Sequence, residues 1–171
     1  MANKLDDLLE VRRDMSVDVM FLVETWHDTD SVAFQRLRAD GFEVVDRPRP
    51  RSRTDTLATN HGGLAAVASP GIRLSSLDLG IKPASFELLP VRVVSGSSAC
   101  VVVVVYRTGP VTTTFFAELS DVMDRCHTRR ASLRRRRSEH PFRSSRRPFI
   151  SPADRLAVVV RSVLARLCAD I

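Results

Sequence analysis

Hydrophobic residues in the first part of the chain form short runs that are separated by polar turns. The first strong run covers residues 17–23 (Val-Asp-Val-Met-Phe-Leu-Val) and ends at Glu24. A run of this length, rich in β-branched and aromatic side chains, predicts a strand that is buried on both faces. Because an unpaired buried carboxylate is costly, we expect Glu24 to lie where this strand leaves the sheet. The carboxyl ends of strands border ligand crevices in open α/β sheets, so Glu24 is a candidate functional residue.

The other runs predict an alternation of helices and strands. Helices are expected where apolar residues recur at helical spacing, over residues 3–14, 30–39 and 111–125. Strands are expected over the β-branched runs, at residues 17–23, 42–45, 61–68, 72–79, 85–94 and 101–106. The last of these runs comprises five valines and Tyr106, which predicts a central strand. The pattern indicates a single α/β domain over residues 1–126.

Charge divides the chain at the same place. The net charge of +6 combines 14 Lys+Arg and 17 Asp+Glu in residues 1–126 with 12 Lys+Arg and 3 Asp+Glu in residues 127–171. Arginine and serine dominate residues 127–150, which predicts a disordered linker. Residues 151–171 carry apolar and basic side chains and predict an isolated amphipathic helix, which either docks on the domain or lies free. The expected chain is a folded domain followed by a disordered basic tail.

Cysteine usage and hydropathy indicate a compartment. The three cysteines form no C-x-x-C pair and no Cys/His cluster with zinc spacing, which favours reduced thiols in an intracellular protein. The N-terminus lacks the apolar stretch of a signal peptide, and no apolar run approaches the ~20 residues of a membrane helix. We therefore expect a nuclear or cytoplasmic protein that is neither secreted nor membrane-spanning.

Five sequence blocks, taken in order, resemble those of one nuclease superfamily. They are Asn-Lys-Leu-Asp-Asp-Leu-Leu (3–9), the apolar run with Glu-Thr-Trp (17–26), His-Gly-Gly-Leu-Ala (61–65), Val-Val-Tyr-Arg-Thr-Gly-Pro (104–110) and Phe-Phe-Ala-Glu-Leu (115–119). The apolar strand followed by Glu-Thr-Trp is the most specific block. On these blocks the chain resembles the endonuclease/exonuclease/phosphatase superfamily (DNase I-like), and more narrowly the endonuclease domains of non-LTR, LINE-type retrotransposons.

The resemblance implies a fold, a reaction and two site residues. The family fold is a four-layer α/β/β/α sandwich, here expected to be incomplete, and its members cut phosphodiester or phosphomonoester bonds with a divalent metal, usually Mg²⁺. By resemblance, Glu24 is a metal ligand and Tyr106 points at the scissile phosphate. Mg²⁺ prefers hard oxygen ligands, neutralises developing charge and helps to activate water. DNA or another nucleic acid is the implied partner, without a small-molecule cofactor or a membrane.

Several family blocks have no counterpart in the sequence. They are the metal-binding asparagine of the family's first strand, the strand that leads into Gly-Asp-x-Asn after the helix near Arg125, and the Ser-Asp-His block with the general base. We therefore expect a domain truncated at both ends relative to the family. General acid–base assistance alone is worth ~10²–10⁴-fold, so an active nuclease is not expected. The change in composition near Arg125 suggests a frameshifted remnant of a retroelement reading frame.

Other interpretations stay open. A non-catalytic basic protein could bind nucleic acid by neutralising phosphates, or the chain could be a degenerate product without function. The candidate phosphate contacts are Arg107, Arg134, Arg135, Arg136 and Arg137. Glu24 could be an ordinary carboxylate facing water, and Tyr106 the last residue of a buried strand. For Trp26, the only tryptophan, packing in the core or at its rim is favoured over base stacking.

Overall fold

Helices and strands alternate along the described part of the chain. The computed structural model describes residues 5–50, 62–107, 109–138 and 156–162, and within these the side chains up to residue 128. In chain order the elements are α1 (Leu5–Asp14), β1 (Val19–Val23), α2 (Val32–Ala39), β2 (Glu43–Arg47), β3 (Leu64–Ala68), β4 (Ile72–Ser76), β5 (Glu87–Ser95), β6 (Ser98–Arg107), α3 (Thr113–Ser138) and β7 (Leu156–Ser162).

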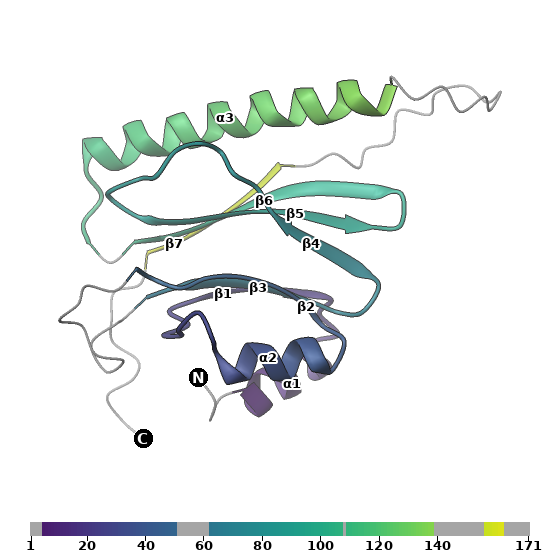
Figure 1. Cartoon of the computed structure of the whole chain (residues 1–171). Helices are drawn as coiled ribbons and strands as arrows, with labels where there is room; N and C mark the ends of the chain where they lie inside the picture. Colours follow the sequence, from purple (N-terminus) through teal and green to yellow (C-terminus); the bar gives the residue numbers. More distant parts are fainter. Residues whose placement is uncertain (1–4, 51–61, 108, 139–155, 163–171) are drawn as a thin grey trace.

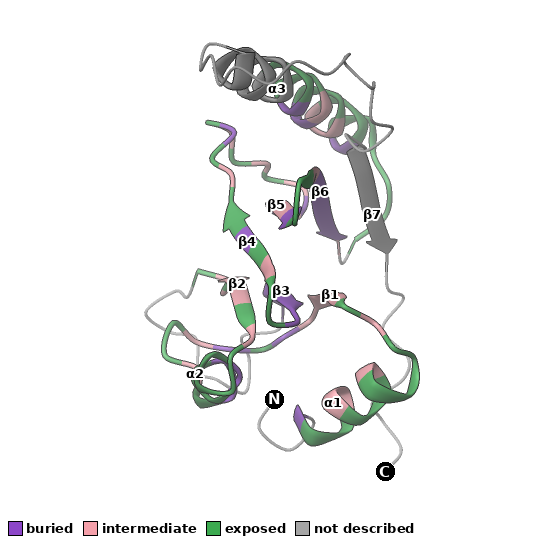
Figure 2. Ribbon diagram, turned by 90° about the vertical axis from the view of Figure 1, so that its right-hand side faces the viewer, coloured by how far each residue is buried: buried purple, intermediate pink, exposed green. Residues whose placement is uncertain are grey.

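The strands form two sheets that lie face to face. One sheet has the order β1-β3-β2 and is antiparallel, and the other has the order β4-β5-β6-β7. Helices α1 and α2 cover the outer face of the first sheet, and α3 covers the outer face of the second (Figure 1). Figure 2 shows the same order of layers from the side, with buried residues of α3 turned toward the sheet. The predicted four-layer α/β/β/α arrangement is therefore confirmed.

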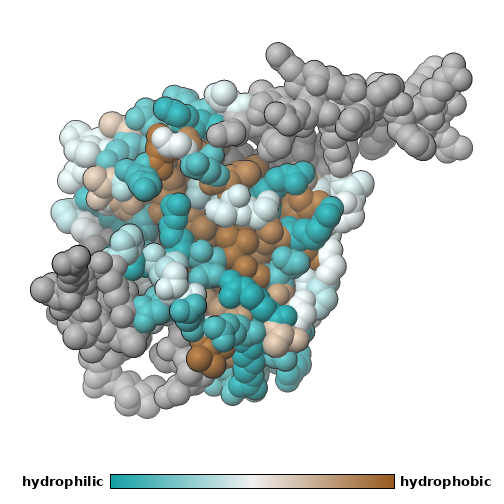
Figure 3. Space-filling view, viewed as in Figure 1, coloured by the Kyte–Doolittle hydropathy of each residue, from teal (hydrophilic) through white to brown (hydrophobic). Residues whose placement is uncertain are grey.

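Three hydrophobic clusters fill the spaces between the layers. The cluster between the two sheets includes Leu64, Leu89 and Val104, and a second cluster lies under α3 around Phe115 and Val122. The third cluster lies between the β1-β3-β2 sheet and helices α1 and α2. On the face seen in Figure 1, hydrophobic residues gather across the middle of the molecule, among hydrophilic ones (Figure 3).

The valine run of β6 is buried on both faces because it lies in the middle of this stack. Val102, Val104 and Tyr106 face the cluster between the sheets, whereas Val103 and Val105 face α3. β6 pairs with β5 in antiparallel and with β7 in parallel orientation. Helix α3 supplies the long crossover connection that a parallel pair needs. The prediction of a central strand over residues 101–106 is confirmed.

The region after residue 126 differs from its prediction. Helix α3 continues through Ser138, where a disordered linker was expected from residue 127. Arginine has a high helix propensity, which lets the arginine-rich sequence extend the helix. Residues 156–162 form strand β7 instead of the predicted helix, in keeping with the strand preference of its three consecutive valines. The rest of the predicted linker and terminal helix, residues 139–155 and 163–171, lies outside the described residues.

Helix α3 turns only one of its two neighbouring phenylalanines toward the sheet. Phe115, Leu119 and Val122 pack on the sheet, but Phe116 is 61% exposed. Consecutive residues of a helix point about 100° apart, so Phe115 and Phe116 cannot both face the sheet directly.

None of the described helices is long and apolar enough to cross a membrane.

Candidate functional site

The turn that follows β1 alternates buried and exposed side chains. Thr25 and His27 are almost fully buried, whereas Glu24 is half-buried and Trp26 is 44% exposed. Glu24 and Trp26 both have positive φ angles, 57° and 45°. Such angles are uncommon for residues other than glycine and persist only where surrounding contacts fix them. The turn is therefore built from two buried anchors and two side chains that face outward.

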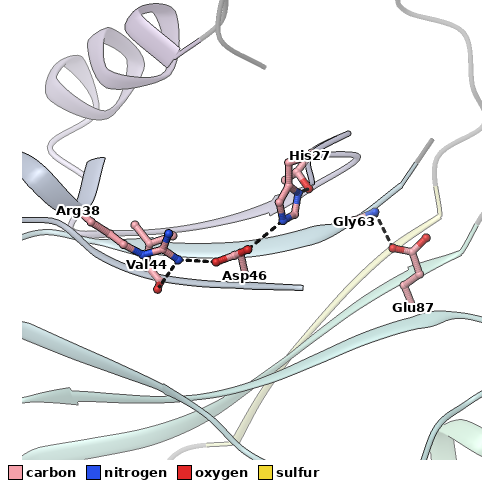
Figure 4. Close-up of polar contacts among 7 residues, drawn as sticks. His27, Arg38, Val44, Asp46, Gly63 and Glu87 are labelled. Atoms are coloured by element: carbon pink, nitrogen blue, oxygen red, sulfur yellow. Dashed lines mark hydrogen bonds and ion pairs between the residues drawn. The ribbon is translucent and has the colours of Figure 1, made fainter. Parts of the chain in front are cut away.

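A buried polar chain fixes the anchors. Thr25 Oγ1 lies 2.6 Å from Nδ1 of His27, and His27 Nε2 lies 3.1 Å from Oδ2 of Asp46 on β2 (Figure 4). Arg38 of α2 donates to the other oxygen of Asp46 at 2.5 Å. This chain ties the turn after β1 to the strand β2 and to the helix α2.

The protonation of His27 follows from its surroundings. Burial lowers the pKa of His27 below its ordinary value, although the hydrogen bond and the negative charge of Asp46 act in the opposite direction. In the neutral imidazole one nitrogen donates and the other accepts. Because the Asp46 carboxylate can only accept, Nε2 carries the proton, and Nδ1 accepts the hydroxyl proton of Thr25. The ring also meets Phe34 edge to face, with the ring centroids 4.7 Å apart.

Two glycines before β3 hold the backbone of the turn. The N–H of Trp26 donates to the carbonyl of Gly62 at 2.8 Å, and the N–H of Thr25 donates to the carbonyl of Gly63 at 3.3 Å. Both glycines have positive φ angles, and a Cβ atom at Gly63 would lie 2.7 Å from Thr25 Oγ1. The Gly-Gly pair is therefore needed for the close approach of the two segments.

Glu87, the first residue of β5, joins this region to the other sheet. Its Oε2 accepts the N–H of Gly63 at 2.7 Å (Figure 4). Its Oε1 accepts a hydrogen bond from Nε of Arg49 at 2.7 Å. Arg47 of β2 donates to the carbonyl of Leu88 at 2.6 Å and adds a second link between the sheets. The Glu87 carboxylate thus forms an ion pair with Arg49 and accepts a backbone hydrogen bond from Gly63.

The structure places Glu24 and Tyr106 at the same end of the sandwich. In the pairing of β1 with β3, Val23 lies opposite Leu64, and Glu24 is the next residue after Val23. Gly63, the residue before Leu64, donates its N–H to Glu87. Glu87 in turn lies opposite Tyr106 in the pairing of β5 with β6. The environments of the two residues differ, however. The Glu24 carboxylate accepts a hydrogen bond from the indole N–H of Trp26, whereas Tyr106 is 2% exposed and packs between the sheets.

The candidate phosphate contacts lie away from this end or have other partners. The Arg107 guanidinium donates to the backbone carbonyls of Ser85, Gly109 and Pro110 and lies over the ring of Phe115. The other four arginines, at positions 134–137, belong to the last turns of α3, and their side chains are outside the described residues.

The described residues form no preassembled metal-binding cluster. Within the described part of the chain, no group of three or more His, Cys, Asp or Glu side chains is placed to hold a metal ion. Glu24 offers one carboxylate, which already accepts a hydrogen bond from the Trp26 indole. Glu87, at the same end, is bound by Arg49 and Gly63. We therefore derive no step through a metal ion.

Sequence reasoning singled out Glu24 but missed the residues that hold it. Thr25, His27 and Glu87 were not assigned roles, although Thr25 belongs to the Glu-Thr-Trp block. Asp46 carried a signal that could have been used. Aspartate is depleted in strands, so an aspartate within a predicted strand suggests that its carboxylate has a hydrogen-bond partner. A carboxylate that opens an apolar strand, such as Glu87, is a similar signal.

Comparisons with known proteins give structural matches at low identity. No protein-family model matches the sequence, and no curated protein matches it. Among solved structures, the human Nocturnin catalytic domain matches with 15% identity and a TM-score of 0.46, over 65% of this chain and 44% of that chain. A truncated Caenorhabditis elegans TDP2 matches with 12% identity and a TM-score of 0.42, over 81% of this chain and 51% of that chain. A humanized D. rerio TDP2 matches with 13% identity and a TM-score of 0.39, over 82% of this chain and 52% of that chain. The chain spans about half the length of these structures.

Proposed function

We propose that this chain is a non-catalytic relative of the DNase I-like phosphodiesterases, a remnant of a retrotransposon-type endonuclease domain. The observation that carries the proposal is the common position of Glu24 and Tyr106. They come from different sheets, and the strand registers and the Gly63–Glu87 hydrogen bond bring them to one end of the sandwich. These are the two residues that the family resemblance assigns to the reaction.

Loss of catalysis is the second part of the proposal. The Glu24 carboxylate is bonded to Trp26, and Tyr106 is a core residue. A strand does follow the third helix, as in the family, but the sequence after β7 is Val163-Leu164 in place of Gly-Asp-x-Asn. Groups that position the reactants and move protons supply much of the rate in enzymes, so a chain without them is inactive.

A plasmid-nicking assay tests the loss of catalysis. The full-length protein and Glu24→Gln are each incubated with supercoiled DNA and Mg²⁺. Both are expected to leave the plasmid at the background level. Nicking by the wild-type protein that requires Mg²⁺ and disappears in Glu24→Gln would overturn this part of the proposal.

The proposed origin has its own test. Translation of the encoding DNA beyond codon 125 in the other two frames is expected to show blocks similar to Gly-Asp-x-Asn and Ser-Asp-His. Their absence from both frames would refute a frameshifted endonuclease reading frame.

A further inference from the structure

The outer side of β1 is an unpaired sheet edge. Among the described strands, β1 pairs only with β3, so it closes one side of the β1-β3-β2 sheet. Next to this pairing, the N–H of Ser69 donates to the carbonyl of Asp18 at 2.9 Å. Because bonded and non-bonded residue pairs alternate in an antiparallel ladder, the backbone groups of Met20 and Leu22 face β3. The backbone N–H and C=O groups of the other residues of β1 therefore point to the open side.

The two edges of this sheet carry different side chains. β2, at the other edge, includes Glu43, Asp46 and Arg47, and charged residues on an edge strand protect it against further pairing. All residues of β1 (Val-Met-Phe-Leu-Val) are apolar, and each of them is only half-buried. The β1 edge is therefore the one that lacks protection against an added strand.

Helix α1 carries an apolar stripe on the flank that faces the same open side. Its other flank faces α2, because Oδ1 of Asp6 lies 3.6 Å from Nη2 of Arg36 on α2. At about 100° per residue, Leu8, Val11 and Met15 lie on the flank away from Asp6. Met15 continues the helical turn by donating its N–H to the carbonyl of Val11, and both side chains are exposed. Helix α1 also extends past β1 on this side (Figure 2).

The second sheet extends one strand farther than the first on the same side. β2 lies across from β4, and β3 lies across from β4 and β5. The side chains of β1 that face inward pack in one cluster with Val102 and Val104 of β6. β7 follows β6 in the second sheet, and no described strand lies across from it. One added strand beside β1 would therefore complete the layer between α1 and the second sheet.

We propose that the open edge of β1 binds one extended apolar segment of another polypeptide by strand addition. In this mode of recognition, main-chain hydrogen bonds supply affinity, and contacts of alternate side chains supply specificity. One face of the added strand lies on the α1 stripe of Leu8, Val11 and Met15, and the other face lies toward the second sheet. The segment is therefore apolar on both faces, as strands between two layers are.

The shape and the charges of the edge select the partner. If two copies of this chain paired through β1, each would bring its own α1 to the side where α1 of the other copy already extends past β1 (Figure 2). A single extended segment avoids this collision. Asp18 precedes β1 and Glu24 follows it, and like charges opposite each other across strands are destabilising. Basic residues at both ends of the apolar segment therefore fit this edge.

A synthetic peptide tests the proposal on the full-length chain. The probe, Lys-Lys-Val-Ile-Val-Leu-Val-Lys-Lys, carries a fluorescent label, and its binding is followed by anisotropy at about 0.2 M salt, which screens the charges of the tail. Saturable binding of a single peptide per chain is expected. A version with glutamine in place of every lysine is expected to bind about two- to threefold more weakly. Absence of saturable binding, or tighter binding of the glutamine version, would contradict the proposed partner.

Methylation of alternate backbone nitrogens of the probe distinguishes strand addition from plain hydrophobic association. An added strand directs only every second N–H toward β1. Methyl groups on one alternate set of nitrogens are therefore expected to abolish binding, whereas methyl groups on the other set change the affinity by less than about threefold. Equal losses with the two sets would overturn the proposal.

Variants of exposed residues locate the bound peptide. Val11→Gln/Met15→Gln replaces two exposed positions of the α1 stripe with a good helix former and is expected to weaken binding on the order of 10-fold. Phe116→Gln, at an exposed position of α3, is the matched control and is expected to bind like the wild type. Thermal unfolding verifies that each variant is folded. Unchanged binding by the double variant, or a dimer in light scattering that excludes the peptide, would overturn the proposal.

Discussion

The backbone N–H of Gly63 donates a 2.7 Å hydrogen bond to Oε2 of Glu87 and thereby joins the two sheets at the end that carries the candidate site. Gly63 lies directly before β3, and Glu87 begins β5. The other carboxylate oxygen binds the guanidinium of Arg49, so the contact combines a backbone hydrogen bond with an ion pair. Since Gly63 also accepts the N–H of Thr25, the position of the Glu24–His27 turn depends on Glu87.

Glu87→Ala is expected to destabilise the fold. It removes the acceptor of the Gly63 N–H and the ion pair with Arg49, and a loss of about 1–3 kcal/mol in the free energy of unfolding is expected. Glu87→Gln keeps one acceptor for Gly63 and is expected to lose less. Urea unfolding measures both, with Glu43→Gln, at an exposed position of β2, as the control that leaves unfolding unchanged. Equal stability of Glu87→Ala and the wild type would show that the contact between the sheets contributes nothing.

Two glycines with nearly the same backbone angle separate conformational strain from steric contact. Gly63 has φ 89° and Gly71 has φ 91°, but an added Cβ meets Thr25 Oγ1 at 2.7 Å in the first case and nothing within 4 Å in the second. An alanine in this left-handed region loses about 1–2 kcal/mol at either position. Thr25 is buried and bonded to His27, so it cannot turn away, and Gly63→Ala is expected to lose about 1–3 kcal/mol more. Chemical denaturation of both variants checks this, and equal losses would refute the steric role of Gly63.

The buried His27 is expected to make stability depend on pH. Its pKa in the folded protein lies below the ordinary value of about 6.5 because burial disfavours the imidazolium. Above pH about 6.5 the residue is neutral in both the folded and the unfolded state and contributes no pH dependence. As the pH falls below this value, the unfolded chain takes up a proton that the folded chain does not. The free energy of unfolding therefore decreases until the folded pKa is reached.

The groups facing His27 define the test of this pH dependence. Asp46 and Asp28 favour its protonation, whereas Arg38 and burial oppose it. Urea unfolding of the wild type is expected to show a loss of stability between pH 7 and about 5.5. This loss is expected to disappear in His27→Gln, whatever the stability of that variant at neutral pH. His127→Gln, at an exposed position of α3, is expected to keep the slope of the wild type. The same slope in His27→Gln and the wild type would assign the effect to other groups.

The sequence predicted the existence of the strands well but not the burial of each: β6 is buried on both faces, whereas β1, expected to be equally buried, is an edge strand whose residues are all half-buried. The runs ending at Val23 and Tyr106 could be recognised because strands in the middle of a layered fold consist of continuous apolar residues. Residues 127–138 and 156–162 could not be recognised in this way, since the helix preference of arginine and the strand preference of consecutive valines are weak beside the packing of the whole fold. There, helix α3 and the pairing of β7 with β6 are set by the rest of the fold.

The candidate site could be predicted only as far as single residues allow. An apolar strand ending in a carboxylate pointed to Glu24, and the structure places that residue at the end of β1. The contact of His27 with Asp46 depends on how β1 and β2 both pair with β3, which no local pattern reveals. Trp26 is 44% exposed in a turn where its own φ is positive, a backbone conformation that no local pattern reveals.

The four arginines 134–137 provide the test of nucleic-acid binding through the basic segment. Deleting residues 127–171 would remove β7 and the end of α3, so replacement in place is the cleaner change. Glutamine has a helix propensity close to that of arginine, and replacing all four is expected to leave the helix intact. We consider a plot of the logarithm of the affinity for duplex DNA against the logarithm of the salt concentration. If each of the four arginines contacts a phosphate, the slope of this plot is expected to be less steep in the fourfold variant than in the wild type, by up to about 3.6. Anisotropy titrations over a range of salt concentrations measure this, with Arg36→Gln/Arg73→Gln, at exposed positions of α2 and β4, as the control for charge alone. An unchanged slope in the fourfold variant would refute a role of this segment in phosphate binding.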